Sequence, residues 1–403
     1  MAAIATGRIA RDIASTATLT SLSNPEINRG PIAASHVPVF KAVALSASSR
    51  YSDRWVVATR RGGDDGVRRH GRHGATRRHN CRASVATEDH AAFLRDVAAI
   101  DPPPLLDALI RVLQAQGEQP VSPADRRGMV PLAVPLSRNP ATGTVTALLR
   151  WPTAPPGMQM PVIRVGEGGG CVLVARSADE YIQRALVEED VGGREGSAEG
   201  DTGRVGEAAG EEGRRLYSPG DFAAAKAKSL DAYLTTKVGM FPDVLERLAL
   251  RHLEQGDQVS ALVAGEFYAR KHFPGFAHPF TFNAQLLLRV GRPTEARDAA
   301  RIALKSPWWT LGASYQEVAE LAGYGDSQLE YALERLTEEG RKEDVNKGKA
   351  EAQVALDQAA FLLDVAAAEG TWDETREQLA GLYREAGLEE MASFVLAGPP
   401  TST

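Results

Sequence analysis

The glycine cluster GEGGG at residues 166–170 is the stretch of this chain that most resembles a chemical site. A phosphate loop needs such glycines to open a helix, with Lys-Ser or Lys-Thr following them. Here the apolar run PVIRV precedes the cluster and CVLVAR follows it, and both runs are typical of strands. The cluster therefore predicts a β-hairpin turn in which glycine supplies positive φ, and not a phosphate site.

Cysteine and histidine are the other residue types that could carry chemistry beyond residue 84. Cys171 alternates with Leu173 along a predicted strand, which favours a buried, small apolar residue over a nucleophile that needs a base beside it. His272 and His278 flank FPGFA, but their spacing is not that of a zinc site, so we expect locally hydrogen-bonded histidines. We predict no catalytic residue, no cofactor, no metal and no enzyme.

Three stretches rich in aromatic residues, methionine and proline could instead bind a partner: WPTAPPGMQMP, SPWWTLG and FPGFAHPF. Tryptophan and methionine are enriched at interface centres, and proline lowers the entropy that docking costs. The alternative is that these side chains pack on the protein's own core, and the sequence leaves both open. Adjacent indoles cannot easily face one core, so we expect one of the tryptophan pair to be exposed. The candidates for partner binding are Trp151, Met158, Met160, Trp308, Trp309 and Phe276.

The first 84 residues have the composition of an organelle transit peptide. They hold 14 of the 46 Lys and Arg residues but 5 of the 52 Asp and Glu residues, and they are rich in Ser and Arg. Their length favours a plastid peptide, with cleavage near Cys81 to Ser84. A basic tail that binds nucleic acid is the alternative.

The chain beyond residue 84 is acidic. It retains 32 basic and 47 acidic residues, a net charge of −15, which disfavours nucleic acid as a partner. No apolar run approaches the ~20 residues that cross a membrane.

The helices and strands expected from the sequence pattern indicate an α+β fold. A small antiparallel sheet of about four strands, accompanied by helices, precedes a mostly helical domain. Pro131 and Pro135 favour an edge position for the first strand. Ser177 with Glu180 is a capping box for the helix after the sheet. The predicted organisation is a transit peptide over 1–84, an α/β module over 85–190, a disordered acidic insertion over 191–215 and a helical domain over 216–398.

Three segments of the helical domain read as helix–turn–helix units, with Gly256, Gly291 and Gly370 at the turns. Ala261 and Ala296 each follow five residues after a glycine, and the first two glycines are 35 residues apart. That interval is close to the tetratricopeptide period of 34 residues, so we predict TPR-like helical hairpins that stack to share a core.

Several strings also resemble a plant family of chloroplast ATP synthase biogenesis factors. They include VTALLRWPTAPPGMQMPVIRV, ADEYIQRALVEED and EARDAARIALKSPWWTLG, and the resemblance runs from about His90 to Val395. It implies a chloroplast assembly factor for the catalytic head of ATP synthase, stromal or peripheral at the thylakoid, that contacts the β subunit. The resemblance does not assign a binding role to any individual residue of this chain. A helical-repeat protein that scaffolds another chloroplast complex or an RNA process is the alternative function.

Overall fold

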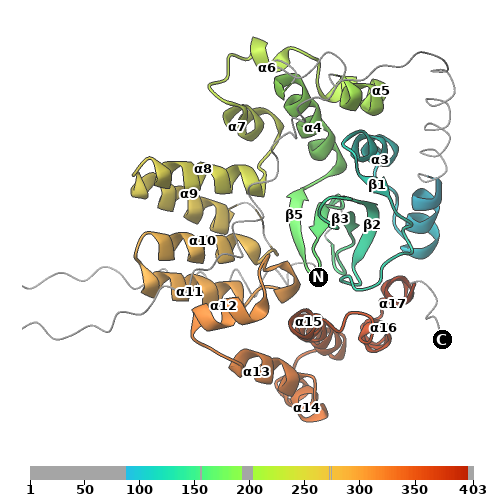
Figure 1. Cartoon of the computed structure of the whole chain (residues 1–403). Coiled ribbons are helices and arrows are strands. Elements are labelled where there is room, and N and C mark those ends of the chain that lie inside the picture. The colour runs from blue at the N-terminus through green and yellow to red at the C-terminus, as the bar shows by residue number, and fades with distance from the viewer. Residues whose placement is uncertain (1–87, 155–156, 193–202, 272, 274, 398–403) are drawn as a thin grey trace, which may run out of the picture. The chain divides into compact units, whose positions relative to one another are not determined.

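A sheet of five antiparallel strands, arranged in chain order, organises the N-terminal part of the described structure (Figure 1). This computed structural model describes residues 88–154, 157–192, 203–271, 273 and 275–397, all of which belong to the unit Arg72–Thr403. The predicted transit peptide lies outside the described residues. The strands are β1 (Gln119–Pro120), β2 (Ala133–Arg138), β3 (Val145–Leu149), β4 (Val162–Val165) and β5 (Cys171–Ala175).

The sequence missed β1, a two-residue strand that pairs only with Ser137 and Arg138 of β2. Pro135 therefore lies where β2 has no strand on its outer side, as a residue without an N–H donor requires. The ladder between β2 and β3 shifts register between Pro135 and Ser137. β1, and not β2, is the edge strand of the sheet, so the predicted edge position is wrong for β2 as a whole and holds only for its part around Pro135.

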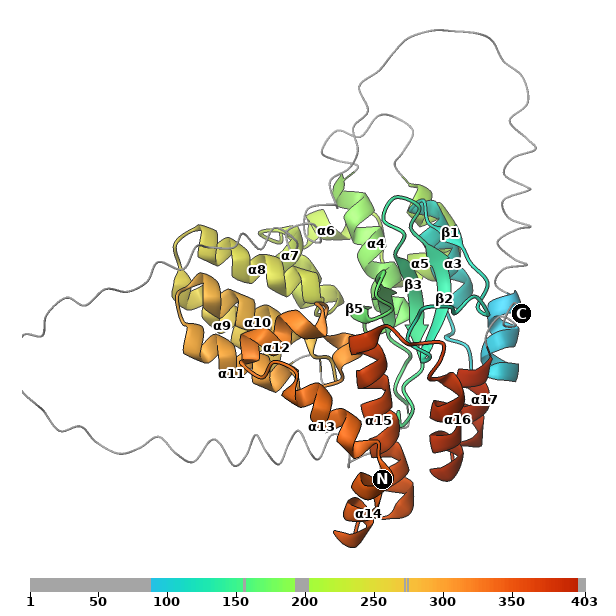
Figure 2. The same cartoon turned by 60° about the horizontal axis from the view of Figure 1, so that its bottom comes forward.

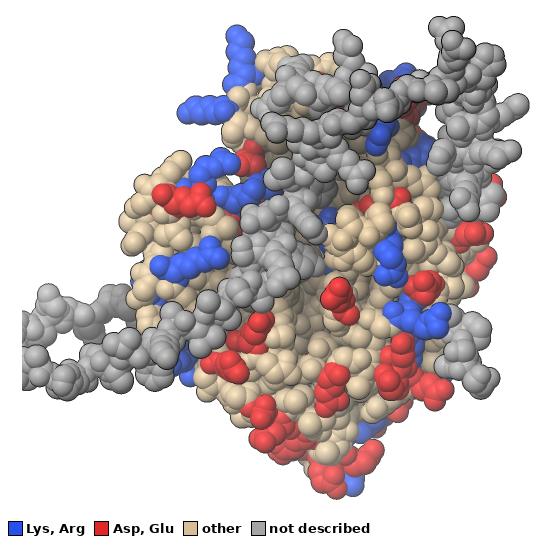
Figure 3. All heavy atoms as spheres, viewed as in Figure 1, with Lys and Arg blue, Asp and Glu red and all other residues tan. Residues whose placement is uncertain are grey.

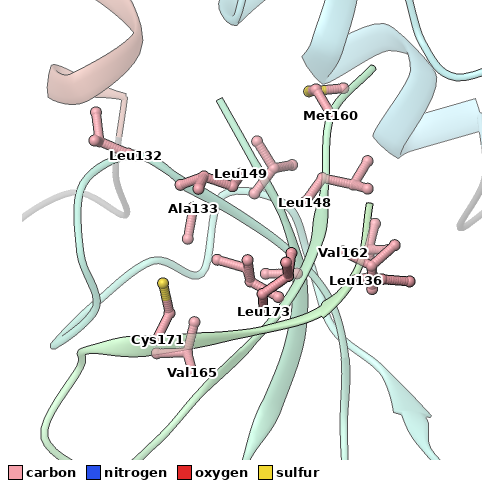
Figure 4. Packing of buried hydrophobic residues seen from close by; sticks show 14 of the residues in the cluster. Leu132, Ala133, Leu136, Leu148, Leu149, Met160, Val162, Val165, Cys171 and Leu173 are labelled. Carbon is pink, nitrogen blue, oxygen red and sulfur yellow. The ribbon is translucent and has the colours of Figure 1, made fainter. Parts of the chain in front are cut away.

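Both faces of the central strands are buried, so these strands do not alternate between apolar and polar residues. All five residues of β3 are buried, as expected when helices or loops cover both sides. Figure 4 shows Leu136, Leu148 and Leu173 gathered within this packing, with the Cys171 sulfur close to Val165. Cys171 is buried, as predicted, and its burial raises the pKa of the thiol.

The helices around the sheet include the two predicted before it, η2 (a π-helix, Phe93–Val97) and α3 (Leu106–Ala115). α4 (Ala178–Gly192) follows β5, and the Ser177 hydroxyl accepts the Glu180 N–H at 3.2 Å. The Glu180 carboxylate reaches back to the N–H of Arg176, one residue earlier than an ideal capping box.

The segment predicted to be disordered contains a helix, α5 (Arg204–Leu216). Val205, Ala209 and Gly213 are its buried residues, and α5 packs against α3 and α4. The prediction of disorder is wrong for α5, while residues 193–202 lie outside the described residues.

The rest of the described chain is helical, and neighbouring helices pack as antiparallel pairs, α8 with α9 and α10 with α11 (Figure 2). The turn glycines Gly256, Gly291 and Gly370 all have positive φ, while Ala261 and Ala296 are fully buried. The helical hairpins are confirmed, and their assignment as TPR-like stays a prediction. The elements are α6 (Asp221–Ala224), α7 (Leu230–Tyr233), η3 (Leu234–Val238), α8 (Pro242–Glu254), α9 (Gln258–Lys271), α10 (His278–Arg289), α11 (Pro293–Ala303), η4 (Trp308–Thr310), α12 (Tyr315–Ala322), α13 (Ser327–Arg335), α14 (Glu338–Asn346), α15 (Glu351–Glu369), α16 (Arg376–Glu385) and α17 (Glu389–Leu396).

Candidate functional site

Three of the predicted partner-binding residues meet in one aromatic cluster that joins the sheet to the helical region. The ring centroid of Trp151, just after β3, lies 5.9 Å from Phe276 and 5.4 Å from Trp309. A Cβ on Gly275 would lie 3.2 Å from the Trp151 ring, so the glycine gives this indole room. Phe276 and Trp309 are buried and Trp151 is half-buried. This cluster packs within the protein's own core.

Trp308 lies in a different core from its neighbour Trp309. Its ring stacks at 4.3 Å on Tyr315, and its indole N–H donates to the Leu304 carbonyl at 3.0 Å. Trp308 is 6% exposed and Trp309 is 4% exposed. The expectation that one indole is exposed is wrong, because each faces its own hydrophobic cluster. A partner contact by either residue stays a prediction that the burial does not favour.

Met158 is the predicted binding residue that remains accessible, since 42% of its surface is exposed while Met160 is buried. Both residues line a half-open pocket of about 160 Å³ between the loop after β3 and α17. Arg150 and Met391 also line it, and the Arg150 guanidinium donates to the Glu390 carbonyl at 3.2 Å. The pocket is mainly apolar with one cationic residue, which suits an apolar side chain from a partner.

The glycine cluster is the predicted hairpin turn between β4 and β5, and it also receives a distant tryptophan. The Trp372 indole N–H donates to the Gly168 carbonyl at 2.9 Å. A Cβ on Gly169, whose φ is +74°, would collide with Trp372 and with the Gly128 carbonyl. A Cβ on Gly170 would lie 3.1 Å from the Trp309 carbonyl. These glycines therefore allow close packing between distant segments, in addition to turning the chain.

Arg126 is a fully buried cation that sequence reasoning missed. Its guanidinium donates to the carbonyls of Ala133, Pro131, Phe394 and Ala397, the last two at 2.6 Å. It also lies 4.1 Å from the Phe394 ring centroid. The carbonyls at the end of α17 carry partial negative charge, so they favour a cation there. Burial, together with the nearby cations Arg376 and Arg150, lowers the pKa of Arg126 well below its ordinary value. The carbonyls therefore offset only part of the cost of removing this cation from water.

His278, at the start of α10, contacts two other parts of the helical region, α8 and the residue that follows η4. Its Nε2 lies 2.9 Å from the Glu246 carboxylate and its Nδ1 lies 3.2 Å from the Leu311 carbonyl. The Tyr268 hydroxyl donates to Glu246 at 2.6 Å. Burial alone would lower the pKa of His278, but the Glu246 carboxylate outweighs it and raises that pKa. The prediction of a purely local hydrogen bond is wrong for His278, and His272 lies outside the described residues.

The acidic charge expected of the chain gathers on α13 and α14. Figure 3 shows Asp and Glu concentrated at the lower end of this face, where Figure 1 places those helices. Glu330, Glu334, Glu338 and Glu339 are exposed, and none forms an ion pair with another residue in the described part of the chain. Over the same part of the chain, no group of three or more His, Cys, Asp or Glu residues could hold a metal ion. No helix described there is long and apolar enough to span a membrane.

The chain belongs to the PAB family. Models of that family match in three consecutive segments: the PAB N-terminal segment over 88–237, the PAB middle domain over 242–325 and the PAB C-terminal domain over 329–397. The chain is 52% identical over 321 residues to the Arabidopsis thaliana protein named IN CHLOROPLAST ATPASE BIOGENESIS, chloroplastic, covering 79% of this chain and 94% of that protein. No solved structure matches the chain significantly.

Proposed function

We propose that this protein is a chloroplast factor for ATP synthase biogenesis that binds an unassembled subunit of the catalytic head. The observation that carries the proposal is the 52% identity spanning 94% of a relative whose name states a role in chloroplast ATPase biogenesis. The β subunit is the partner that the sequence resemblance implies, and the stroma, or the stromal surface of the thylakoid, is the proposed place of action. Such a factor acts as a chaperone by covering subunit surfaces, and we propose no catalytic step for it.

The Met158 pocket is the proposed anchor point for the subunit. A methionine that is 42% exposed beside a mainly apolar pocket offers adaptable contact area. Trp151 and Met160 also line the pocket. Trp309 and Phe276 act indirectly in this proposal, because they pack against Trp151, which lines the pocket. Trp308 packs in the other hydrophobic cluster and has no part in this anchor point.

The acidic surface of α13 and α14 is proposed to steer the encounter. Unpaired carboxylates raise the association rate with a basic surface and make that rate sensitive to salt. Nucleotide sites on an unassembled ATPase subunit carry basic residues, so they suit this surface. The proposal predicts an association rate that falls steeply with ionic strength and a dissociation rate that changes little.

The test is capture of separately supplied subunits of the ATP synthase head by the full chain, compared with capture from chloroplast stroma. We expect one subunit, β in the first instance, to bind in both settings. Met158→Glu should weaken binding at least about tenfold, because a charge in an apolar anchor site costs more than ~1.4 kcal/mol. The matched control is Leu288→Glu on α10, since Leu288 is 40% exposed and lies outside the pocket.

The outcomes separate the parts of the proposal. Binding to a head subunit other than β would overturn the partner and keep the role. Unchanged binding by Met158→Glu would overturn the surface alone. Recovery of RNA or of another complex, with no ATP synthase subunit, would overturn the proposed function and favour the scaffold alternative.

A further inference from the structure

The outer face of α9 carries a stripe of exposed apolar side chains. Val259 is 74% exposed and Val263 is 62% exposed, the two highest values among the large apolar side chains of the described residues. Phe267 continues the spacing of four residues and is 40% exposed. Residues four apart lie above one another on a helix, so these three side chains form one line.

A groove adjoins this stripe between α9 and α11, with α10 at its base. Its volume is about 270 Å³, and Leu262, Leu287 and Ile302 supply part of its apolar lining. Glu266 and Arg270 of α9 also line the groove. Arg292, Glu295 and Asp298 line the groove toward α11, so the surface beyond the stripe is a mixture of apolar and charged side chains.

The two ends of α9 carry opposite charge. Asp257 precedes the helix and accepts the Ser260 N–H at 2.9 Å as an N-cap. Arg270 lies near the other end, where it pairs with Glu266 at 3.2 Å and keeps a side chain that is 65% exposed. An antiparallel copy of the same helix would bring the acidic start of one α9 beside the basic end of the other.

We infer that the α9 stripe is the contact surface of a symmetric dimer of this chain, in which the two α9 helices pack antiparallel about Val263. Residues equally far on either side of Val263 face each other in such a pair, so Phe267 meets Val259 of the second copy. Arg270 falls one position from the partner's Asp257, which gives an ion pair at both ends. A two-fold interface requires this self-complementarity of one patch.

The expected dimer is weak. A helix of 14 residues is about 21 Å long, and two of them bury less than the ~1,600 Å² of a standard stable interface, even with the groove added. We expect monomer and dimer to exchange with concentration, and the dimer to be lost when the stripe becomes charged.

Sedimentation of the full chain over a range of concentrations tests this inference. We expect the mean mass to rise toward twice the monomer mass, and Val263→Glu to keep the chain monomeric with unchanged circular dichroism. The matched control is Val345→Glu, on an exposed valine of α14, which should dimerise as the parent does. Arg270→Glu should weaken the dimer at low salt, because it places like charges beside Asp257.

A cross-link supplies the geometric readout. In a Cys81→Ser background, Val263→Cys should form an intermolecular disulfide under mild oxidation, since a residue on a two-fold axis meets itself. The single remaining natural thiol, Cys171, is buried, and Val345→Cys should give no such product. A mass that stays monomeric at every concentration overturns the dimer. Loss of subunit capture by Val263→Glu from a chain that is always monomeric also overturns it and assigns the stripe to a partner.

Discussion

Replacing Arg126 with Met should separate the C-terminal helix from the sheet. The side chain has no exposed surface, and its donors reach carbonyls before β2 and at the end of α17, residues 268 and 271 positions away. Methionine has a similar length and can keep the contact with the Phe394 ring, but it donates no hydrogen bond. Four carbonyls then lose their guanidinium donor, namely those of Ala133, Pro131, Phe394 and Ala397.

The expected loss of unfolding free energy is about 3–5 kcal/mol. Each carbonyl left buried without a donor costs ~1 kcal/mol or more, and removing a desolvated cation returns part of the total. Urea unfolding followed by circular dichroism measures the change, with Arg289→Met on the exposed side of α10 as the matched control. Hydrogen exchange should show early loss of protection in α16 and α17. A loss below about 1 kcal/mol, with unchanged protection there, would mean that Arg126 does not hold the two ends together.

Three further changes test other parts of the structure. Deleting residues 204–216 should lower the unfolding free energy by about 2 kcal/mol or more, because α5 buries apolar surface against α3 and α4; a smaller loss in urea unfolding would mean that α5 contributes little. Burial raises the pKa of Asp364 to about 8, so its share of stability falls as pH rises from about 4 to 8. Asp364→Asn should therefore gain stability over the parent between pH 5 and pH 8, and a constant difference would contradict this. The raised pKa of His278 has the opposite physical origin, since Glu246 stabilises the protonated ring. The contribution of this pair to the free energy of unfolding is complete below about pH 6.5 and is lost above the folded pKa of His278. His278→Gln should cost more stability at pH 6 than at pH 9, as measured by thermal unfolding at both values.

Local sequence pattern predicted the strands and the helical hairpins because short-range signals specify them. Runs of strand-forming residues are separated by turn residues every ten or so positions. A glycine with positive φ ends a helix whatever surrounds it. The same rules failed for α5, whose glycine-rich composition suggested disorder. Val205, Ala209 and Gly213 are its buried residues, and Gly210 interrupts the helix with a φ of +64°. A Cβ on Gly213 would come 3.3 Å from Leu186, so this glycine lets α5 lie close to α4. The glycines that suggested disorder therefore serve a kink and a close helix contact, which composition alone conceals.

The tryptophan pair shows why candidate anchors could not be separated from core residues by sequence. The premise that two adjacent indoles cannot share one core was sound, but the conclusion that one must be exposed assumed that only one core existed. Trp309 packs with Trp151 in one hydrophobic cluster, and Trp308 packs with Tyr315 in another. Which residues are accessible therefore depends on contacts between distant segments, and Met158 emerges as the exposed member only once those contacts are known.

These contacts bear on how the protein can bind an unassembled subunit. The glycine turn between β4 and β5 lies in the PAB N-terminal segment, where it meets Trp309 of the middle domain and Trp372 of the C-terminal domain. Arg126 adds a second link between the first segment and the last. Family segments joined through buried backbone groups cannot separate to enclose a partner without exposing unpaired carbonyls and indoles. The described segments should therefore act as one preformed body. Under the proposed function, a subunit would bind to surfaces that are already exposed, such as the Met158 pocket and the acidic face of α13 and α14.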